Sequence, residues 1–470
     1  MTLTKPAVQP RLLAALVFAA LTTAVVSSLG MLLVPTISHE LSVEVSTGQW
    51  TLTVNLLVGA IATPIMGRLS DGPHKKRLLL ISLALILAGS ALAAAAPNFA
   101  IFLAGRALQG LTYGIVPVTI AMARRYLPDR QVRPGISSLS VTVATGLGVG
   151  YPLTGILAAL FGFRSAFWFA ALFLLAALAV VWRMVPDGPD ERAPRGPFDV
   201  RGAVLIAVGL SVLLLAISEG SNWGWLSPLT LALLAAAAAI LAGWCAVELR
   251  TPHPLINLRV MRNQDVLVAN CTAIGLGAAM YVGLSIVSLI AQAPAATGYG
   301  IAMPLFWAGF VMLPLSVGSF GANRAVRLLA HRIGLRTLIL VGSGLVTAAS
   351  LLMWLAHDEL WEVMIGMFGF GVGMGMTYAA MPVLIERSVA DTALGSAVSF
   401  NQVLRTVGGA FGSAVSAAVL AAHLAPDLYP TDAGINMPLA IGTIGCAIVC
   451  GALIANRWTA RRPATSNPGA

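Results

Sequence analysis

Apolar runs of about 20 residues recur along this chain from near its beginning to near its end, separated by short polar segments. A helix of that length spans roughly 30 Å, the thickness of the hydrocarbon core of a bilayer. Of the 470 residues, 58% are hydrophobic and only 10% are charged. These are too few polar side chains to cover the surface of a water-soluble fold. The sequence therefore predicts an all-α, polytopic membrane protein.

The pattern divides into fourteen predicted transmembrane helices. They cover residues 12–34, 49–66, 78–96, 100–121, 136–157, 164–182, 202–218, 228–246, 266–291, 301–321, 337–355, 362–384, 394–421 and 437–455. Of the 28 lysines and arginines, 25 fall in the tails and in connections on one side, Arg164 falls on the other side, and Arg106 and Arg405 lie within helices. Because basic loops stay in the cytoplasm, both termini are predicted to be cytoplasmic, with anionic lipids as partners of the basic loops.

A polar break and an internal repeat divide the chain further. The segment 182–201 is rich in proline, glycine and charge and is typical of a linker. RLSDGPHKKRLLLI, from Arg68, shares residues with RLLAHRIGLRTLIL, from Arg327, at an offset of 259, and Gly148 matches Gly408 at an offset of 260. Duplicated halves around a midplane site are typical of secondary transporters. We predict an N-terminal six-helix bundle at 1–183, a linker with inserted helices 7 and 8 at 184–263, and a C-terminal six-helix bundle at 264–470.

The positions of the polar residues argue against an enzyme. All six histidines and almost every carboxylate lie in or beside connections, so no cluster of acids and histidines is expected inside the bilayer. No phosphate-binding P-loop is present, which argues against a primary pump. We expect no catalytic residue, no metal and no cofactor. The net charge of +10 is confined to short loops, so no nucleic-acid partner is expected.

Two arginines inside helices are the strongest candidates for a functional site. Burying a cation in a bilayer costs energy, so an intramembrane arginine usually faces a cavity or a partner. For Arg106 and Arg405 the alternative is snorkelling or a structural clamp on carbonyl groups, and for the amides near them it is hydrogen bonding between helices. The candidate substrate-binding or coupling residues are Asn55, Arg106, Gln109, Tyr113, Asn270, Tyr378, Asn401, Gln402 and Arg405.

Three motifs resemble those of the major facilitator superfamily. GRLSDGPHKKR, from Gly67 to Arg77, is similar to the family's loop between helices 2 and 3. FLAGRALQG is similar to its helix-4 pattern Arg-x-x-Gln-Gly, and GVGYPLTG to the antiporter motif of helix 5. With fourteen spans, the whole chain resembles the fourteen-helix drug:proton antiporter branch. The resemblance implies two bundles that alternate access, with gating residues Gly67, Asp71, Arg77, Arg130, Gly148 and Pro152.

The resemblance also defines what this chain lacks. In the family the charged loop holds the outward-open state, which implies that Asp71 lies near the start of helix 13 and near arginines such as Arg130. Helix 1 has no acid where many relatives carry aspartate; Ser27 lies near that place. Glu219 and Asp265, at helix ends, are candidates for the missing acid. Without a midplane carboxylate, we hypothesise that the protein prefers neutral, zwitterionic or anionic compounds to lipophilic cations.

These observations predict a secondary active efflux transporter of the bacterial inner membrane. It would export small hydrophobic or amphipathic compounds, drug- or antibiotic-like, by alternating access. Proton antiport is implied by the resemblance, with the proton gradient as the energy source, and the protein is expected to be a monomer. The alternatives are an exporter or facilitator of a lipid or an endogenous metabolite, and a non-transporting membrane receptor or scaffold, which would produce no solute flux.

Overall fold

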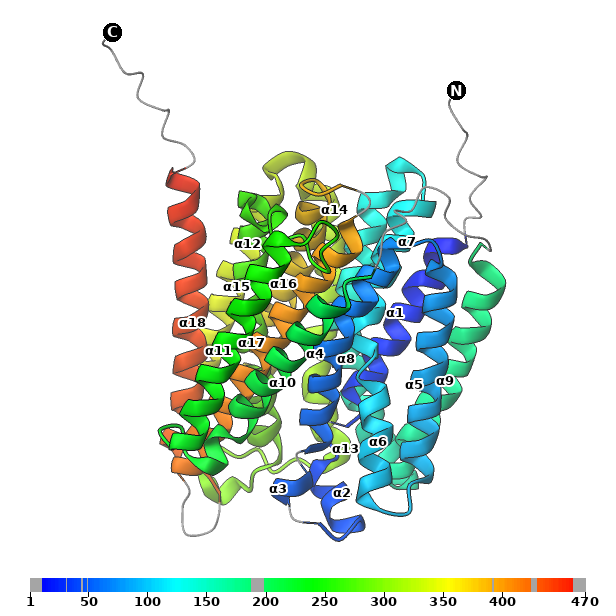
Figure 1. Ribbon diagram of the computed structural model, residues 1–470. Helices are drawn as coiled ribbons and strands as arrows, with labels where there is room; N and C mark the ends of the chain where they lie inside the picture. Colours follow the sequence, from blue (N-terminus) through cyan, green and yellow to red (C-terminus); the bar gives the residue numbers. More distant parts are fainter. Residues whose placement is uncertain are drawn as a thin grey trace, which may run out of the picture.

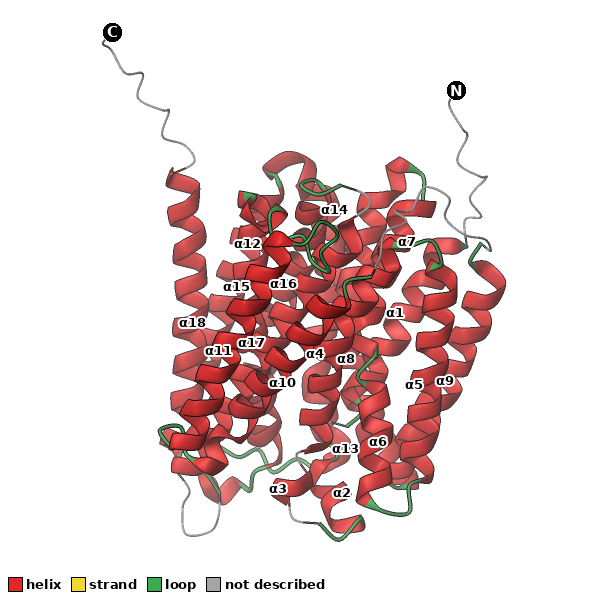
Figure 2. Ribbon diagram, in the orientation of Figure 1, coloured by secondary structure: helices red, strands yellow, loops and turns green. Residues whose placement is uncertain are grey.

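The computed structural model describes residues 11–30, 32–43, 45–48, 50–186, 198–390, 393–423 and 429–459. Within these ranges the chain consists of helices and loops and contains no strand (Figure 2). The long helices run roughly parallel to one another along the height of the molecule (Figure 1). The fold is therefore all-α, as predicted from the apolar runs.

The helices fall into three groups along the chain. The first group is α1 (Leu12–Ser28), the short α2 (Val34–Glu40) and α3 (Val45–Gly48), α4 (Trp50–Asp71), α5 (Lys75–Ala95), α6 (Phe99–Gln109), α7 (Thr112–Tyr126), α8 (Asp129–Phe161) and α9 (Phe163–Met184). An additional pair follows, α10 (Val200–Trp223) and α11 (Pro228–Arg250). The last group is α12 (Gln264–Gln292), α13 (Leu305–Ala308), the 3-10 helix η3 (Gly309–Met312), α14 (Leu313–Ile333), α15 (Leu335–Leu355), α16 (Leu360–Glu386), α17 (Leu394–Ala422) and α18 (Asp432–Thr459).

In the described part, twelve helices are long and apolar enough to cross a membrane, with α6 and α7 counted as one. The other two predicted spans are α1, which is shorter, and the region 301–321, which is built from α13, η3 and the first part of α14. Each of the fourteen predicted spans thus coincides with a helix or with an interrupted helix. The prediction of an all-α polytopic membrane protein is confirmed.

Several predicted helix boundaries are wrong; α8, for example, begins at Asp129 rather than at 136, and α14 continues to Ile333 rather than ending at 321. Three of the differences have a local reason. The span 12–34 ends at Ser28, and the chain turns at Gly30, where a Cβ would lie 2.7 Å from the Arg106 Nη2 atom. The span 301–321 begins only at Leu305, after Pro304, because proline disfavours a helical conformation in the residue before it. The helix predicted at 100–121 is interrupted at Gly110, between α6 and α7.

The first and last helix groups, which we call the N-terminal and C-terminal halves, meet along two helix pairs. α4 packs on α17, and α8 packs on α14. Of the additional pair, α10 packs on α11 and also contacts both α4 and α17 (Figure 1). The additional pair therefore lies along one of the two seams between the halves.

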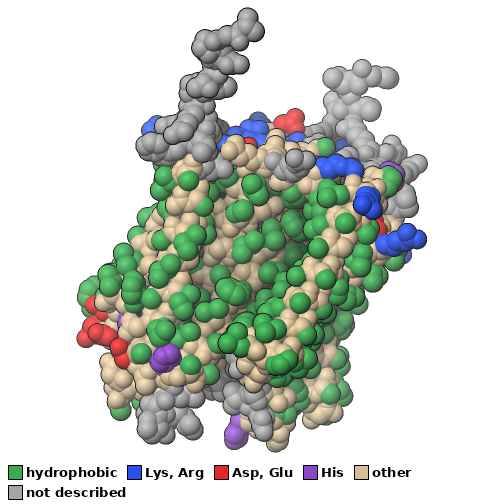
Figure 3. Space-filling model, turned by 60° about the vertical axis from the view of Figure 1, so that its left-hand side comes forward, with side chains coloured by type: hydrophobic (Ala, Val, Ile, Leu, Met, Phe, Trp, Pro, Cys, Tyr) green, Lys and Arg blue, Asp and Glu red, His purple; other side chains and the backbone are tan. Residues whose placement is uncertain are grey.

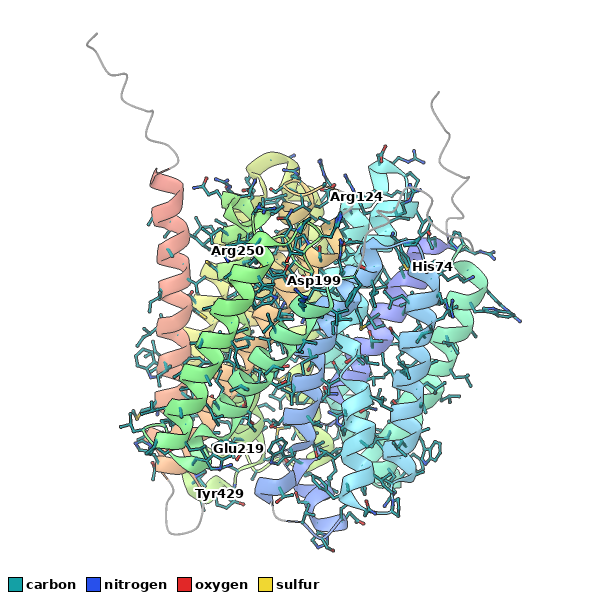
Figure 4. The ribbon with its side chains drawn as sticks, in the orientation of Figure 1. His74, Arg124, Asp199, Glu219, Arg250 and Tyr429 are labelled. Atoms are coloured by element: carbon teal, nitrogen blue, oxygen red, sulfur yellow. The ribbon has the colours of Figure 1, made fainter. Side chains whose placement is uncertain are left out.

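The two ends of the molecule differ in charge. Lysine and arginine side chains gather at one end, which we call the basic end (Figure 3). His74, Arg124 and Arg250 lie toward this end, whereas Glu219 and Tyr429 lie toward the opposite end (Figure 4). The described part of the chain enters α1 and leaves α18 at the basic end (Figure 1).

Candidate functional site

The carboxylate of Asp71 joins the two halves at the basic end. It is 3% exposed and accepts hydrogen bonds from the backbone N–H groups of Gly395 (2.7 Å) and Ser396 (3.0 Å). These N–H groups belong to the first turn of α17, where the helix dipole favours an anion. One turn earlier in α4, a Cβ on Gly67 would lie 2.8 Å from the Gly395 carbonyl oxygen. The structure therefore brings Gly67 and Asp71 to the contact between α4 and α17.

Arg77 and Arg130 lie at the same end without contacting Asp71. Arg77 is exposed in the first turn of α5, and Arg130 is exposed in the first turn of α8. Among the described residues, neither side chain has a hydrogen bond or an ion pair with Asp71. The expected approach of Arg130 to Asp71 is therefore not found; the carboxylate is bound by backbone N–H groups of α17.

An ion pair that we did not predict closes the same end. Glu386, at the end of α16, is 5% exposed and contacts the guanidinium of Arg124 from α7. Arg133 Nε lies 3.6 Å from the second oxygen of Glu386. Arg124 and Glu386 are 262 positions apart, close to the offset of about 260 between the two repeats, so they lie at corresponding helix ends of the two halves. This correspondence in the sequence could have revealed the pair.

Gly148 and Pro152 lie where α8 crosses the C-terminal half. A Cβ on Gly148 would lie 3.0 Å from the backbone nitrogen of Ser316 in α14, and the Ser316 hydroxyl donates to the Thr145 carbonyl oxygen at 2.6 Å. A Cβ on Gly309 would lie 3.0 Å from the Pro152 Cα atom. Small residues thus let the backbones of the two halves touch along the second seam.

A small cavity of about 40 Å³ lies between the halves, and we call it the central cavity. Tyr113 from α7 and Tyr281 from α12 approach each other across it, with their hydroxyl oxygens 3.4 Å apart. Sequence reasoning missed Tyr281, an aromatic residue inside an apolar run. The polar side chains that line the central cavity are Thr23, Ser27, Thr112, Tyr113, Tyr281, Tyr378, Gln402, Arg405 and Thr406.

A larger hollow of about 650 Å³, which we call the vestibule, lies farther along α12 and α17. It includes Tyr429, which marks the opposite end of the molecule (Figure 4). Its volume suits a drug-sized molecule. Thr53 from α4 and Ser218 from α10 both line it, with their hydroxyl oxygens 2.8 Å apart, so the additional pair contributes to its wall. Among the described residues the polar lining is uncharged: Thr53, Ser218, Ser285, Ser288, Gln292, Ser413, Ser416 and Tyr429.

The two intramembrane arginines have different surroundings. Arg106 is fully buried; its Nη1 donates to Gln109 Oε1, and its Nε donates to the Thr51 carbonyl oxygen at 3.3 Å. It lines neither hollow. The guanidinium carbon of Arg405 lies 4.1 Å from the centre of the Tyr378 ring, and its Nε and Nη1 have no hydrogen-bond partner in the described part of the chain. Only Arg405 faces the central cavity.

The other predicted amides connect helices within one half. Asn55 Nδ2 donates to the Arg106 carbonyl oxygen at 3.1 Å, and Gln109 Nε2 donates to a serine hydroxyl on α5 at 2.8 Å. In the other half, Asn401 Nδ2 donates to Asn270 Oδ1 at 3.0 Å. These four amides line neither hollow, so of the nine candidate substrate residues the structure brings Tyr113, Tyr378, Gln402 and Arg405 together.

The acids considered for the missing helix-1 carboxylate also lie away from the hollows. Asp265 pairs with Arg336 at the start of α12, and Glu219 accepts a hydrogen bond from Asn222 at 2.9 Å. Neither acid lines the central cavity or the vestibule. Within the described ranges, no three His, Cys, Asp or Glu side chains come together in a way that could hold a metal ion.

A buried carboxylate in the additional pair was also not predicted. Glu248 on α11 is 1% exposed, and its Oε1 accepts a hydrogen bond from Trp244 Nε1 at 2.9 Å. A Cβ on Gly202 would lie 2.5 Å from an Asp199 oxygen and 2.6 Å from a Glu248 oxygen, so the two acids are neighbours. The ring centroids of Trp244 and Phe400 are 6.1 Å apart, which ties α11 to α17.

Two helical halves that close one end of the molecule, with a hollow toward the other end, define the protein as a membrane transporter rather than an enzyme. Comparison with known families agrees with this class: residues 15–413 match the family model described as Major Facilitator Superfamily. The chain belongs to the Major Facilitator Superfamily. The predicted superfamily and fold are therefore confirmed.

Similar proteins fit this assignment. An uncharacterised MFS-type transporter of Mycobacterium tuberculosis is 28% identical over 411 residues, which cover 85% of this chain and 58% of that protein. The multidrug resistance protein Stp of the same organism is 26% identical over 399 residues, covering 84% of this chain and 73% of Stp. The crystal structure of the human organic anion transporter MFSD10 has a TM-score of 0.65 at 17% identity, covering 95% of this chain and all of that one. The structural likeness shows the fold alone.

Proposed function

We propose that the protein is a secondary active transporter that exports small hydrophobic or amphipathic compounds by alternating access. The observation that carries this proposal is a vestibule of about 650 Å³ walled by both halves, while the same halves are closed at the basic end. The closure consists of the contacts of Asp71 with α17 and of Arg124 with Glu386. A transporter that releases its cargo away from the basic end passes through a conformation of this kind.

The remaining assignments follow from the charge pattern and from the relatives. The name of Stp supports drugs as the substrate class, and the fourteen helical spans support the drug:proton antiporter branch. The basic loops support a bacterial inner membrane with both termini in the cytoplasm, so the vestibule opens outward. We take the working unit to be a monomer with bundles at 1–183 and 264–470 and the inserted pair at 184–263.

In this scheme the gating residues act at the two seams. Gly67 and Asp71 hold α4 against α17, Gly148 and Pro152 let α8 move against the C-terminal half, and Arg77 and Arg130 orient the basic end toward anionic lipid. The proton gradient supplies the energy. No carboxylate lines either hollow in the described part of the chain, so a carboxylate that carries the proton would lie outside both hollows.

Export from cells and proton movement in vesicles test the proposal together. Cells without their own efflux pumps should accumulate less of a neutral or anionic amphipathic dye when they produce the protein, and an uncoupler should abolish the difference. In proteoliposomes, adding an exported compound should move protons in the opposite direction, detected with a pH-sensitive dye. A lipid or metabolite carrier would leave dye accumulation unchanged, and a receptor or scaffold would move neither dye nor protons; both outcomes contradict the proposal.

A further inference from the structure

Arg405 is a buried cation whose hydrogen-bonding capacity is only partly used by the protein. Its side chain is 7% exposed, and its guanidinium lies over the Tyr378 ring, 4.1 Å from guanidinium carbon to ring centre. Nε and Nη1 are buried without a hydrogen-bond partner among the described residues. A buried donor that is left unpaired is costly, and a buried charge more so. The site is therefore incomplete without an acceptor.

The surroundings of Arg405 favour an anion as that acceptor. Within the described chain, the lining of the central cavity has no aspartate or glutamate, and its polar groups are hydroxyls and the Gln402 amide. Arg106 is placed differently: its Nη1 and Nε already donate to Gln109 and to a backbone carbonyl, and although its Nη2 has no partner in the described part of the chain, the residue lines neither hollow. Arg405 is thus the one of the two intramembrane arginines whose unpaired N–H groups belong to a residue that lines a hollow in the described structure.

The vestibule lies next to the central cavity along two helices that line both hollows. One face of α17 carries 402, 406, 410, 413 and 417, and the first two positions line the central cavity while the others line the vestibule. One face of α12 does the same with 281, 285, 288 and 292. At 1.5 Å per residue, Ala410 lies about 7.5 Å farther along the axis of α17 than Arg405. A molecule whose apolar body occupies the vestibule could therefore extend a short arm toward Arg405.

We propose that Arg405 binds the carboxylate or other oxyanion of an amphipathic organic acid, whose apolar body lies in the vestibule. Tyr378 holds the guanidinium in place through its ring face, and the hydroxyls around the central cavity supply further donors. This assignment of a substrate class rests on the proposed function. It explains why a cation is kept in a cavity that lacks a counter-ion.

Equilibrium binding of 1-pyrenebutyric acid and of its methyl ester to the purified full-length protein tests this site. Fluorescence anisotropy should show saturable binding of the acid. Arg405→Gln should weaken binding of the acid by about tenfold or more and leave that of the ester within about threefold, because only the acid forms charge-assisted hydrogen bonds. Arg405→Lys keeps the charge without the planar guanidinium, so its affinity for the acid should lie between those of the unsubstituted protein and of Arg405→Gln. Arg332→Gln, which removes an exposed arginine, is the matched control and should change neither.

Thermal unfolding of each variant separates a loss of binding from a loss of folding, and Arg405→Lys keeps the test valid if Arg405→Gln does not fold. No saturable binding of the acid to the unsubstituted protein, or an equal loss for acid and ester in the variants, would overturn the assignment. The measurement does not depend on transport. If the protein binds the acid through Arg405 in preference to the ester but exports nothing, only the proposed function is rejected. If it exports compounds but Arg405 does not distinguish acid from ester, only the anion site is rejected.

Discussion

Replacing Asp71 with asparagine removes one charge from the contact between the two halves while keeping the size of the side chain. The carboxylate accepts two hydrogen bonds, at 2.7 Å from Gly395 N and 3.0 Å from Ser396 N, and both donors belong to the other half. Asparagine has one oxygen, so one bond is lost and its amide N–H₂ faces the N–H group that the carboxylate had bound. Because the contact exists only while the basic end is closed, the loss falls on that conformation alone.

The size of the effect follows from the geometry. A hydrogen bond to a charged, buried acceptor is worth about 1.5–3 kcal/mol, and an anion at a helix N-terminus adds about 0.3–1 kcal/mol. Asp71→Asn should therefore destabilise the closed basic end by about 2–4 kcal/mol. Since 1.4 kcal/mol is a factor of ten, the ratio of closed to open molecules should fall by roughly 30-fold or more.

Spin labels at Gln131 and Arg332, exposed positions at the basic end of the two halves, can measure this ratio. In Asp71→Asn, pulsed electron paramagnetic resonance should show a longer distance population that is minor in the unsubstituted protein, and transport should be lost without loss of membrane insertion. Asp265→Asn is the matched control, because the ion pair of Asp265 with Arg336 lies within one half. Unchanged distances in Asp71→Asn, or the same change in the control, would refute the reasoning.

Three further predictions concern other contacts. Arg124→Glu should open the basic end, because it places two carboxylates together, and adding Glu386→Arg should restore both closure and transport. Closure is measured with the same spin labels and transport by export from cells. If the double variant does not recover, the ion pair is not a gate. Gly105→Val should lower the free energy of unfolding by about 1–3 kcal/mol, because its Cβ would lie 2.6 Å from a backbone oxygen of α5. Gly445→Val is the control: a Cβ there meets open space, so thermal unfolding should be unchanged. Glu248→Ala should destabilise the protein by about 1–3 kcal/mol, because it leaves a buried indole N–H without an acceptor. Glu248→Gln keeps an acceptor and should unfold within about a degree or two of the unsubstituted protein. An equal loss of stability in the two variants would contradict this account.

The positions of the helices could be predicted because the thickness of the bilayer fixes the length of an apolar run. Their ends could not, since they depend on neighbours far away in the sequence. α1 ends at Ser28 and the chain turns at Gly30, beside a guanidinium that belongs to α6. The approach of Asp71 to the start of α17 was expected only because the charged loop resembles that of a known family.

The site was harder to predict than the fold. Sequence position shows that an arginine lies inside a helix, but it does not show which helix face meets another element. The same reasoning therefore selected Arg106, whose hydrogen bonds are made within its own half, and Arg405, which faces a cavity. Tyr281 and Glu386 were missed because each acts through a partner more than a hundred residues away.

The additional pair has a consequence for how the halves can separate. α10 contacts both α4 and α17, so a movement that parts these two helices cannot preserve both contacts. On the α17 side the tie includes the aromatic contact of Trp244, on α11, with Phe400. On the α4 side it includes the hydroxyl contact of Ser218, on α10, with Thr53. Two aromatic rings bury more apolar surface than one pair of hydroxyls, so we expect the pair to travel with the C-terminal half and to slide over α4. A passage for membrane-dissolved compounds would then open sideways, at the line where Thr53 and Ser218 part.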